Sequence, residues 1–390
     1  MAKRTYDVVV VGAGILGSTT AYYLKRNGVS NVLLLDRGDA ASGGTGKSAA
    51  IVRSYYSVPV MARLAREAVM LFHNLEEEIG VDGGFHATGF TQLVPPDWVD
   101  TAKALVAMHQ SLGVDTDFVG KQDWETRFPW LEPEGLGAIV FEAASGYADP
   151  VQTTEGFVNA FQNLGGQFQP GTPVRGLVRD GDRITGVILE SEQITAAAVV
   201  NAAGPWSTFL AKSADIDLPI RAVREQDSVW EVRPGRALPS TPVSNPIEAT
   251  YMRPMGEGRW LFGRGYPKSY FDVDPYNYKE SADEDFVLDL RDRWCQRIPS
   301  LQGSKLLHAY AALYDVTPDW IPFVGPREGL DGYYDAAGGS GHAFKTGPIF
   351  GRELAEWIVE NSVRDDFRQF SHDRLAAGNS FDQAFGGNRV

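Results

Sequence analysis

Three glycines near the start of the chain have the spacing of a phosphate-binding turn. Gly12, Gly14 and Gly17 follow the valine run 8–11 and open a segment with the composition of a helix. In this spacing the glycines permit a tight turn, a close approach of the backbone to a pyrophosphate, and close packing of helix on strand. The N-terminal amides and the dipole of that helix would face the phosphate. The spacing predicts a dinucleotide site; a glycine-rich turn without a ligand is the alternative.

An acidic residue ends the second strand of the same unit. Asp36 follows the apolar run 32–35 and lies nineteen residues after Gly17. A carboxylate at this place can accept hydrogen bonds from both ribose hydroxyls, and it would repel a 2′-phosphate. Strand, glycines, helix, strand and acid thus stand in the order of a nucleotide-binding βαβ unit.

A second glycine turn lies more than three hundred residues later, within 332–359. There we expect a strand, a turn through Gly339 and Gly341, and a helix that begins near Thr346 with Pro348 in its first turn. One ligand can contact both turns only if the cofactor domain is discontinuous, with a β-rich segment inserted between its parts. The long flavin dinucleotide fits two such distant contacts better than NAD does, which favours FAD.

The composition excludes several classes of function. The net charge of −14 argues against nucleic acid and anionic membrane surfaces as partners. The single cysteine, Cys295, fits a reducing, cytoplasmic compartment and removes the dithiol pair of a flavin disulfide reductase. No apolar run approaches eighteen residues, so no membrane-spanning helix is expected, and no metal site is expected either.

The rest of the chain divides into helical and strand-rich segments. Helices are expected over 59–79, 97–112, 153–166 and 283–298, and strands over 88–94, 172–200 and 220–275, with a hairpin at 179–183. This pattern predicts an α/β fold with an α+β insert: a discontinuous Rossmann-like FAD-binding domain and an inserted antiparallel-sheet substrate domain. The FAD-binding domain is placed at 1–85, 150–215 and 325–375, the substrate domain at 86–149 and 216–324, and a C-terminal tail at 376–390.

Five ordered segments give the chain a family resemblance. They are VVVVGAGILGSTTAYYL, GGTGKSAAIVRSYY, VVNAAGPWS, YDVTPDWIPFVGP and AAGGSGHAFKTGP. Together they resemble the FAD-dependent amine oxidoreductases of the D-amino acid oxidase superfamily, and within it the branch of sarcosine oxidase and the sarcosine oxidase β-subunit. The likeness runs from residue 6 to about 360, and it is more specific for fold and cofactor than for substrate.

The resemblance implies a set of cofactor contacts. It places the three glycines of the first turn at the FAD pyrophosphate and Asp36 at the adenosine ribose, with Arg37 in the same group. The further implied contacts are Gly44, Thr45, Lys47 and Ser48 on a loop beside the pyrophosphate and flavin, Val174 near the adenine, and Ala202 and Gly204 along the nucleotide.

Four residues of the second glycine turn are implied at the isoalloxazine ring, namely Gly339, Gly341, His342 and Lys345. The helix that follows them would point its positive end at the N1–C2=O edge, where negative charge collects on reduction. Lys345 would add a full charge there; a solvated lysine at a helix start is the alternative. For His342 the alternative is a loop histidine without a role.

The resemblance also implies residues for the substrate. Arg53 matches the arginine that binds the substrate carboxylate in sarcosine oxidase-like enzymes, and a guanidinium suits a carboxylate through bidentate hydrogen bonds. Tyr251 falls where the family has an aromatic residue over the substrate. A salt-bridged arginine and an ordinary sheet tyrosine are the alternatives, and Tyr56 and Arg253 are weaker candidates. With His342 and Lys345, Arg53 and Tyr251 form the predicted catalytic group.

The chain departs from the family at positions that concern oxygen and the flavin tether. Gly263 and Pro267 fall where sarcosine oxidases have a lysine and a histidine above the flavin, which puts oxidase activity in doubt. Ala312 and Ser48 fall where two subgroups have a cysteine or a histidine bonded to the flavin. We therefore expect FAD to be non-covalent and an electron-acceptor protein or a hetero-oligomer to be a partner.

The activity implied is hydride transfer to flavin N5 from a C–H next to an amine nitrogen, followed by hydrolysis of the imine. The expected substrate is a small amine-bearing carboxylic acid. The enzyme would need positioning and a neutral amine more than a strong base. The alternatives are oxidation of a hydroxy acid or other alcohol, with His342 as the base, and a non-catalytic FAD-bearing subunit of an electron-transfer complex.

Overall fold

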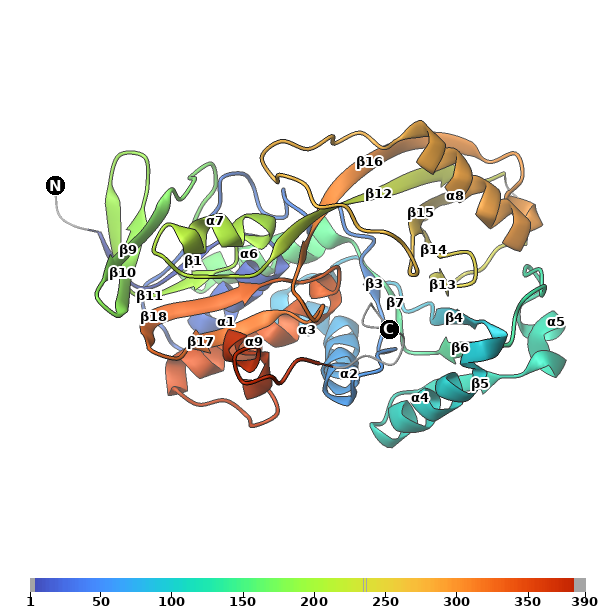
Figure 1. Ribbon diagram of the computed structural model, residues 1–390, viewed down its shortest axis with the longest axis horizontal. Coiled ribbons are helices and arrows are strands. Elements are labelled where there is room, and N and C mark those ends of the chain that lie inside the picture. The colour runs from blue at the N-terminus through green and yellow to red at the C-terminus, as the bar shows by residue number, and fades with distance from the viewer. Residues whose placement is uncertain (1–3, 234, 236, 382–390) are drawn as a thin grey trace.

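Two eight-stranded sheets form the framework of the protein, which is described here from a computed structural model covering residues 4–381 except 234 and 236. Figure 1 shows the sheets at opposite ends of the long axis. The first has the strand order β17-β18-β10-β11-β1-β2-β8, with β9 paired to β10. Its strands are β1 (Thr5–Val11), β2 (Val32–Leu35), β8 (Gln167–Gln169), β9 (Gly176–Asp180), β10 (Arg183–Ile188), β11 (Gln193–Asn201), β17 (Phe323–Arg327) and β18 (Leu330–Ala337).

The second sheet has the order β16-β12-β15-β14-β13-β4-β6-β5, and a short pair, β3 and β7, lies between the two sheets. Its strand pairs are antiparallel except β13 with β4. The strands of the short pair are β3 (Ile51–Val52) and β7 (Gly146–Tyr147). Those of the second sheet are β4 (Phe90–Val94), β5 (Thr116–Val119), β6 (Ala138–Glu142), β12 (Arg221–Glu231), β13 (Val243–Asn245), β14 (Thr250–Pro254), β15 (Arg259–Arg264) and β16 (Lys305–Val316).

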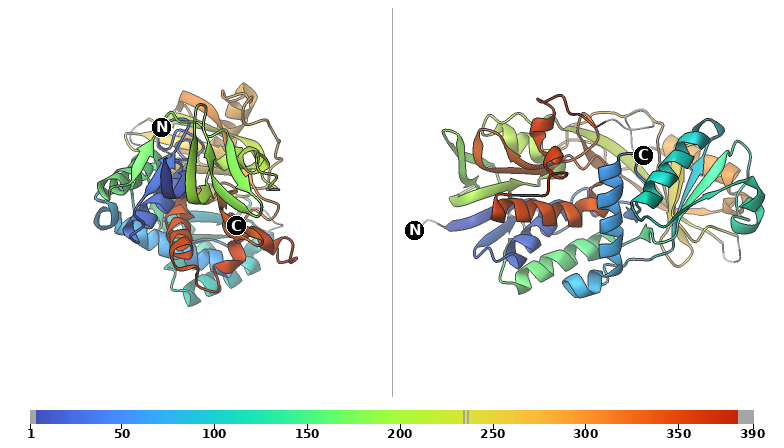
Figure 2. Two further views of the ribbon diagram at one scale, coloured as in Figure 1. Left: turned by 90° about the vertical axis from the view of Figure 1, so that its left-hand side faces the viewer. Right: turned by 90° about the horizontal axis from the view of Figure 1, so that it is seen from below.

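Helices cover the sheets. They are α1 (Ile15–Arg26), α2 (Pro59–His73), α3 (Leu75–Ile79), α4 (Val99–Ser111), α5 (Trp124–Arg127), α6 (Pro150–Asn163), α7 (Ser207–Lys212), α8 (Glu284–Arg297) and α9 (Ala343–Glu360). Both α9 and α6 pack against α1 on one face of the first sheet, as the view from below shows in Figure 2. The second sheet has α8 on one face, where Leu290 and Trp294 join its core.

The valine run of β1 explains why the first sheet is buried on both faces. Val8 and Val10 belong to the core shared with α1, α6 and α9, whereas Val9 and Val11 belong to the core on the opposite face with α7. The neighbouring strands β2, β11, β8 and β18 run parallel in this part of the sheet. Such two-sided burial is what a continuous apolar run in a parallel sheet indicates.

The predicted fold class is confirmed. Strands of the first sheet come from three separated parts of the chain, and strands of the second sheet come from the two parts between them. The hairpin expected at 179–183 is formed by β9 and β10. The domain limits stay a prediction. The predicted tail at 376–390 lies, from residue 382 onward, outside the described residues.

The prediction of one continuous helix over 59–79 was wrong. The segment 59–79 forms two helices, α2 and α3, which meet at Asn74. The Asn74 side chain donates from Nδ2 to the carbonyl of Met70 (2.8 Å), and the residue has φ −114° and ψ 20°. Asparagine side chains compete in this way with the helical backbone bonds. The apolar spacing continued through the break, so the spacing alone did not reveal it.

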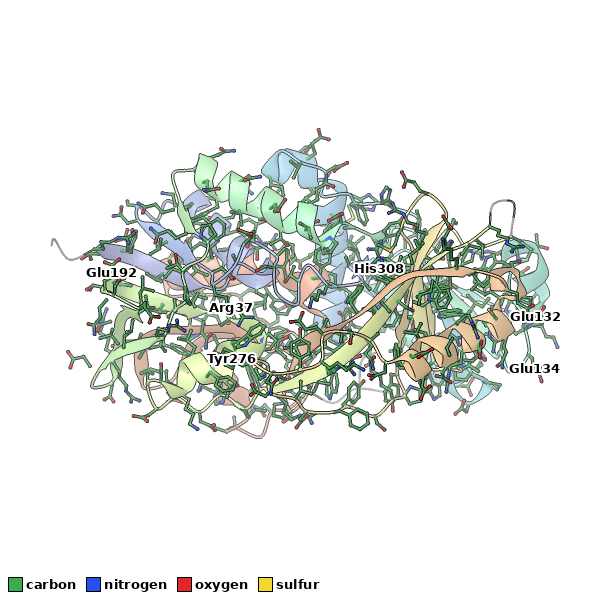
Figure 3. The ribbon with its side chains drawn as sticks, turned by 90° about the horizontal axis from the view of Figure 1, so that it is seen from above. Arg37, Glu132, Glu134, Glu192, Tyr276 and His308 are labelled. Carbon is green, nitrogen blue, oxygen red and sulfur yellow. The ribbon has the colours of Figure 1, made fainter. Side chains whose placement is uncertain are left out.

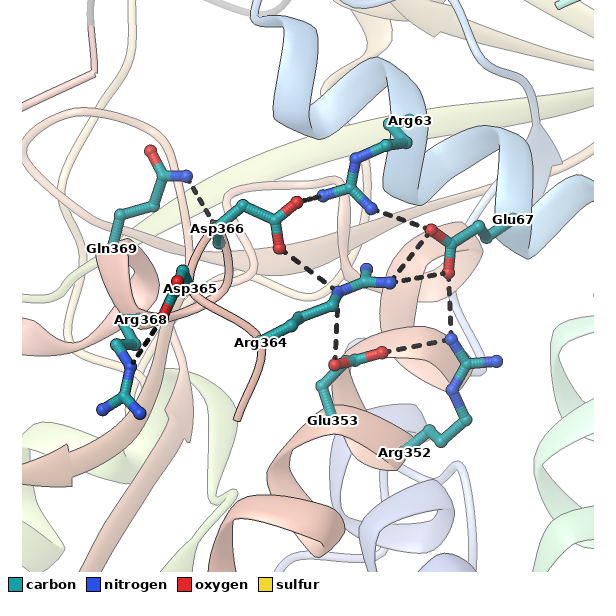
Figure 4. Close-up of polar contacts among 9 residues, drawn as sticks. All are labelled: Arg63, Glu67, Arg352, Glu353, Arg364, Asp365, Asp366, Arg368 and Gln369. Atoms are coloured by element: carbon teal, nitrogen blue, oxygen red, sulfur yellow. Dashed lines mark hydrogen bonds and ion pairs between the residues drawn. The ribbon is translucent and has the colours of Figure 1, made fainter. Parts of the chain in front are cut away.

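An ion-pair cluster joins α2, α9 and the segment that follows α9 (Figure 4). Glu67 of α2 pairs with Arg63 (2.9 Å), with Arg352 of α9 (2.9 Å) and with Arg364 (3.2 Å). Arg364 also pairs with Glu353 of α9 (3.3 Å). Because these side chains are partly buried and share partners, the cluster ties α9 to α2 beyond the apolar contacts.

Candidate functional site

Backbone atoms pack tightly against two glycines of the first glycine turn. A Cβ on Gly12, whose φ is +111°, would lie 2.2 Å from the carbonyl oxygen of Ala202, and a Cβ on Gly17 would lie 1.8 Å from the oxygen of Gly12. Gly14 caps the start of α1, and Thr45 Oγ1 accepts from the amide of Ile15 (3.1 Å). The first and third glycines thus hold β1, α1 and β11 together, while the second leaves room at the helix start.

Asp36 connects the turn to the end of β2. Its Oδ2 accepts from the amide of Ala13 (2.7 Å) and its Oδ1 from the amide of Gly38 (2.8 Å). Burial raises the pKa of Asp36, and these two backbone bonds partly offset that increase. A carboxylate has about four acceptor positions, so ribose hydroxyls can still bind to it.

A cavity of about 360 Å³ runs over this turn. It begins between β2 and Val174 and continues past the start of α1 to Phe344 in α9. Twelve residues that the sequence predicted as cofactor contacts line it: Gly12, Gly14, Asp36, Arg37, Gly44, Thr45, Lys47, Ser48, Val174, Ala202, Gly204 and Gly341. The predicted contacts Gly17, Gly339, His342 and Lys345 are not among the residues that line it, and neither are the substrate candidates Arg53 and Tyr251.

The outer part of the cavity has the groups that an adenosine needs. The guanidinium carbon of Arg37 lies 3.7 Å above the Trp206 ring, and Trp206 Nε1 is buried without a hydrogen-bond partner among the described residues. Arg37 and Tyr276 lie close together at this part of the cavity, near the middle of the molecule (Figure 3). Three groups here fit an adenine nucleotide. They are the Trp206 Nε1 donor, the Arg37 guanidinium stacked on the Trp206 ring, and the Asp36 carboxylate beside the start of α1.

The second glycine turn is held by one carboxylate. Asp315 of β16 accepts from the amides of Gly338 (2.8 Å) and Gly339 (3.0 Å). Gly338 and Gly341 both have φ +78°, a conformation that favours glycine. The turn therefore fixes the end of β18 against the second sheet and directs α9 at the cavity.

The predicted start of the helix after this turn was wrong. The helix α9 begins at Ala343 rather than near Thr346, and Pro348 lies inside it rather than in its first turn. Thr346 Oγ1 donates to the carbonyl of His342 (3.1 Å), and Thr19 Oγ1 of α1 donates to the carbonyl of Gly347 (3.0 Å). The helix thus continues through a proline that sequence rules place near an end, in a region where α9 packs on α1.

Lys345 consequently lies in the first turn of α9, and it is only 7% exposed. A solvated lysine, the alternative reading of this position, is contradicted by that burial. Burial and the positive end of a helix both disfavour a cation, so interactions with other groups must stabilise it. An anion or an electron-rich ring bound near the start of α9 would add to that stabilisation.

Arg53, Tyr56, His342 and Lys345 form one cluster, which we call the cation cluster. The guanidinium carbon of Arg53 lies 4.9 Å from the centroid of the Tyr56 ring, and Lys345 Nζ lies 5.7 Å from it. Tyr56 Oη is 3.1 Å from His342 Nδ1. Tyr56, a weaker candidate by sequence, is thus the residue that brings the others together, and His342 is a buried partner of its hydroxyl.

Two buried residues that the sequence did not indicate hold the backbone of this cluster. Glu142 accepts from the amide of Ser54 (2.8 Å) and from Ser145 Oγ (2.6 Å), and His109 Nε2 donates to the carbonyl of Tyr56 (2.8 Å). Burial lowers the pKa of His109, so its ring is neutral at pH 7. Arg53 itself donates to the carbonyl of Tyr55.

Tyr251 contacts a carboxylate that the sequence analysis missed. Its hydroxyl donates to Oδ1 of Asp227 (2.7 Å), and Asp227 and its neighbour Glu225 line the cavity. Glu225 forms a buried ion pair with Lys268. The available signal was two acids spaced by two residues in a strand, which places both on one face. Arg253, the other weak candidate, is buried over the Tyr147 ring.

Comparison with known proteins identifies the family. Residues 7–357 match the family described as "DAO: FAD dependent oxidoreductase". The chain belongs to this family. The predicted resemblance, the cofactor FAD and the assignment as an enzyme are thereby confirmed.

Similar proteins cover most of the chain. It is 27% identical to FAD-dependent oxidoreductase domain-containing protein 1 of Bos taurus, over 91% of this chain and 81% of the relative. It is 26% identical to the sarcosine oxidase subunit beta of an Arthrobacter species, over 98% and 94%. The crystal structure of an L-proline dehydrogenase from P. horikoshii has a TM-score of 0.89 at 25% identity, over 97% and 100%. Several further curated relatives are more than twice as long as the part that matches.

None of the helices in the described part of the chain has the length and apolar character needed to cross a membrane.

Proposed function

We propose that the enzyme oxidises a C–H next to the amine nitrogen of an amino acid-like substrate, and that the cation cluster binds the substrate carboxylate. The observation that carries this proposal is the position of Arg53 and Lys345 around one Tyr56 ring. Both cations face the same aromatic ring, so a carboxylate bound beside that ring would be attracted by both charges. Arginine in addition offers the planar donor pair that suits a carboxylate.

Bound FAD supplies the two-electron oxidation. The residues of this chain have the remaining tasks of holding the substrate, excluding water and controlling its protons. The first glycine turn and Asp36 would hold the nucleotide, and Lys345 at the start of α9 would place positive charge near the reacting ring. The sarcosine oxidase subunit and the L-proline dehydrogenase among the similar proteins support a secondary amino acid as the substrate.

The two other functions considered receive less support. Oxidation of a hydroxy acid requires a base for the hydroxyl proton, and His342, the predicted base, has its Nδ1 beside the Tyr56 hydroxyl. A non-catalytic FAD subunit would have no need of two cations around the Tyr56 ring. We further propose that reduced flavin passes its electrons to a protein partner within a hetero-oligomer, which the likeness to an oxidase subunit supports.

An anaerobic screen of the purified holoenzyme tests the proposal. Sarcosine, dimethylglycine, L- and D-proline, glycine, L-alanine and L-lactate are each added, and loss of the oxidised flavin absorbance is recorded. We expect bleaching by at least one amino acid and none by lactate. Bleaching by lactate alone would support the hydroxy acid alternative, and no bleaching at all would support the non-catalytic one.

A further inference from the structure

We propose that Asp227 accepts the proton of the substrate ammonium group, with Tyr251 as the residue that positions its carboxylate. This inference rests on the proposed function and names a catalytic residue for it. The substrate class that follows is an amine that arrives protonated and must become neutral before its C–H can be oxidised.

The register of the second sheet brings Asp227 and Tyr251 together across a glycine. Gly263 of β15 is paired with Tyr251 of β14 on one side and with Asp227 of β12 on the other. A Cβ at Gly263 would lie 2.1 Å from Tyr251 Cζ and 2.3 Å from Asp227 Oδ1. The hydrogen bond between the two side chains therefore fills the space that a side chain at position 263 would need. This is a physical reason for glycine there.

The pair lies on the face of the sheet that is directed at the cavity. Trp230, Met252 and Phe262 belong to the core with α8, so the residues that alternate with them point the other way. Asp227 lines the same cavity as Gly341 and Phe344 at the start of α9. The hydrogen bond from Tyr251 uses Oδ1, which leaves Oδ2 for a ligand. A ligand lying along α9 toward the second sheet would thus meet this carboxylate.

Two neighbouring carboxylates in this wall have different surroundings. Glu225 is paired with the ammonium of Lys268, whereas Asp227 is held by the neutral phenol of Tyr251. Burial raises the pKa of Asp227 to about 7; the Tyr251 hydrogen bond lowers it and the charge of Glu225 raises it. The titratable and charged groups that face Asp227 are Tyr251 and Arg253 of β14, Glu225 of β12, Lys268 after β15 and Tyr310 of β16, and Tyr314 of β16 faces Tyr251.

These surroundings suit a proton acceptor near neutral pH, because a base acts best when its pKa is close to the working pH. In the step we propose, an N–H bond of the ammonium breaks and an O–H bond to Asp227 forms. The nitrogen keeps the electron pair and becomes neutral. Both charges disappear together, so no unpaired charge remains in the closed cavity. The neutral nitrogen then has the lone pair that oxidation of the adjacent C–H requires, and bound FAD would supply that oxidation.

The test compares Asp227→Asn and Tyr251→Phe with wild type, with Asp292→Asn on the exposed side of α8 as the matched control. The rate of anaerobic flavin bleaching by sarcosine and by L-proline is measured from pH 6 to 10. We expect the wild-type rate to rise as Asp227 loses its proton near pH 7. Asp227→Asn should be slower by at least about tenfold at pH 7. The deficit should shrink as the pH approaches the pKa of the free amine.

Tyr251→Phe should move the acid limb of the profile to higher pH, because it removes the hydrogen bond that lowers the pKa of Asp227. If Tyr251 were only structural, Tyr251→Phe would lower the rate equally at all pH values. If Asp227→Asn keeps the wild-type pH profile while amines bleach the flavin, Asp227 is not the acceptor and the proposed function stands. If no amine bleaches the wild-type flavin at any pH, the proposed function fails and this inference fails with it.

A second readout requires no turnover. The folded pKa of Asp227 is raised above its unfolded value of about 3.9, so its contribution to stability is complete below that value and is lost as the pH rises through about 7. The asparagine variant does not lose stability in this way, because asparagine does not titrate. The melting temperature of Asp227→Asn relative to wild type should therefore increase from pH 5 to pH 8, unlike that of Asp292→Asn. A constant difference would mean that Asp227 stays ionised, and would overturn the inference.

Discussion

Arg53 is the residue on which recognition of a carboxylate most depends. In Arg53→Lys the charge remains but the planar pair of donors is lost, and in Arg53→Ala the charge is lost as well. We expect acetate, titrated against the flavin spectrum, to bind roughly ten- to hundredfold more weakly to Arg53→Lys, as the loss of a charged hydrogen bond of about 1.5–3 kcal/mol implies. Arg53→Ala should bind it more weakly still.

The control for this change is Arg291→Lys at a partly exposed arginine of α8, which should bind acetate as wild type does. Flavin content and melting temperature should stay near wild type in both Arg53 variants. Unfolding of Arg53→Ala, or unchanged acetate binding, would show that Arg53 is structural and stacks on Tyr56 and Phe90 only.

Residues of the site differed in how well the sequence revealed them. The glycines, Asp36 and Lys345 lie in local motifs, in which the order of residue types along the chain indicates the local geometry. Asp227 had no such motif, because its role depends on the register of three strands, β12, β14 and β15, and on the absence of a side chain at Gly263. Glu142 and His109 were missed for the same reason. They act on Arg53 and Tyr56 through backbone contacts that only the folded chain brings together.

At the scale of elements, the contact between α1 and α9 depends on glycine. A Cβ on Gly351 would lie 2.3 Å from Thr19 Oγ1 and 2.7 Å from the backbone nitrogen of Thr20. Alanine in place of a helical glycine normally stabilises a helix by about 1 kcal/mol. Here we expect Gly351→Ala to lower the free energy of unfolding instead, by about 1–3 kcal/mol, because overpacking outweighs helix propensity.

Chemical denaturation monitored by tryptophan fluorescence would measure this effect. Glu356→Ala on the exposed side of the same helix is the control, and it should change stability by less than about 0.5 kcal/mol. A Gly351→Ala variant more stable than wild type would mean that α9 shifts freely along α1. In that case the position of Lys345 would not be fixed by this packing.

Helices and strands were predictable from the sequence where the apolar residues kept one spacing along the whole element. The βαβ unit, the hairpin β9–β10 and the helix α8 follow their apolar patterns closely. The predictions failed where a side chain or a distant contact changed the backbone. Asn74 divides α2 from α3 through its own hydrogen bond, and α9 continues through Pro348 where Thr19 of α1 donates to the carbonyl of Gly347. Neither contact appears in the spacing of apolar residues.

For the whole molecule, we predict that FAD is held without a covalent bond. Ala312 and Ser48 line the cavity at the positions where related subgroups attach the flavin, and neither provides the cysteine or histidine used there. Heat or acid precipitation should leave the yellow chromophore in the supernatant, and the mass of the polypeptide should equal that of the unmodified sequence. A yellow pellet, or a mass increased by a flavin, would contradict the prediction.

We also expect reduced flavin to react slowly with oxygen and faster with an artificial acceptor. The position of the oxygen-activating lysine in sarcosine oxidases is Gly263, and the Tyr251–Asp227 hydrogen bond occupies the space above it. Stopped-flow mixing of the reduced enzyme with air-saturated buffer, and separately with ferrocenium, would give both rates. A rate with oxygen equal to that of an oxidase would assign this task to another cation, with Lys268 beside Glu225 as the first to test.

The central claim is that the cation cluster selects amino acids for oxidation by FAD. The most direct test is the anaerobic bleaching of the wild-type flavin by matched pairs: L-proline against pyrrolidine, and sarcosine against dimethylamine. Each pair shares its reacting amine and differs by the carboxylate. We predict that at least one amino acid reduces the flavin and does so at least about tenfold faster than its decarboxylated partner at equal concentration. Equal rates within both pairs, or reduction by the amines alone, would contradict the account.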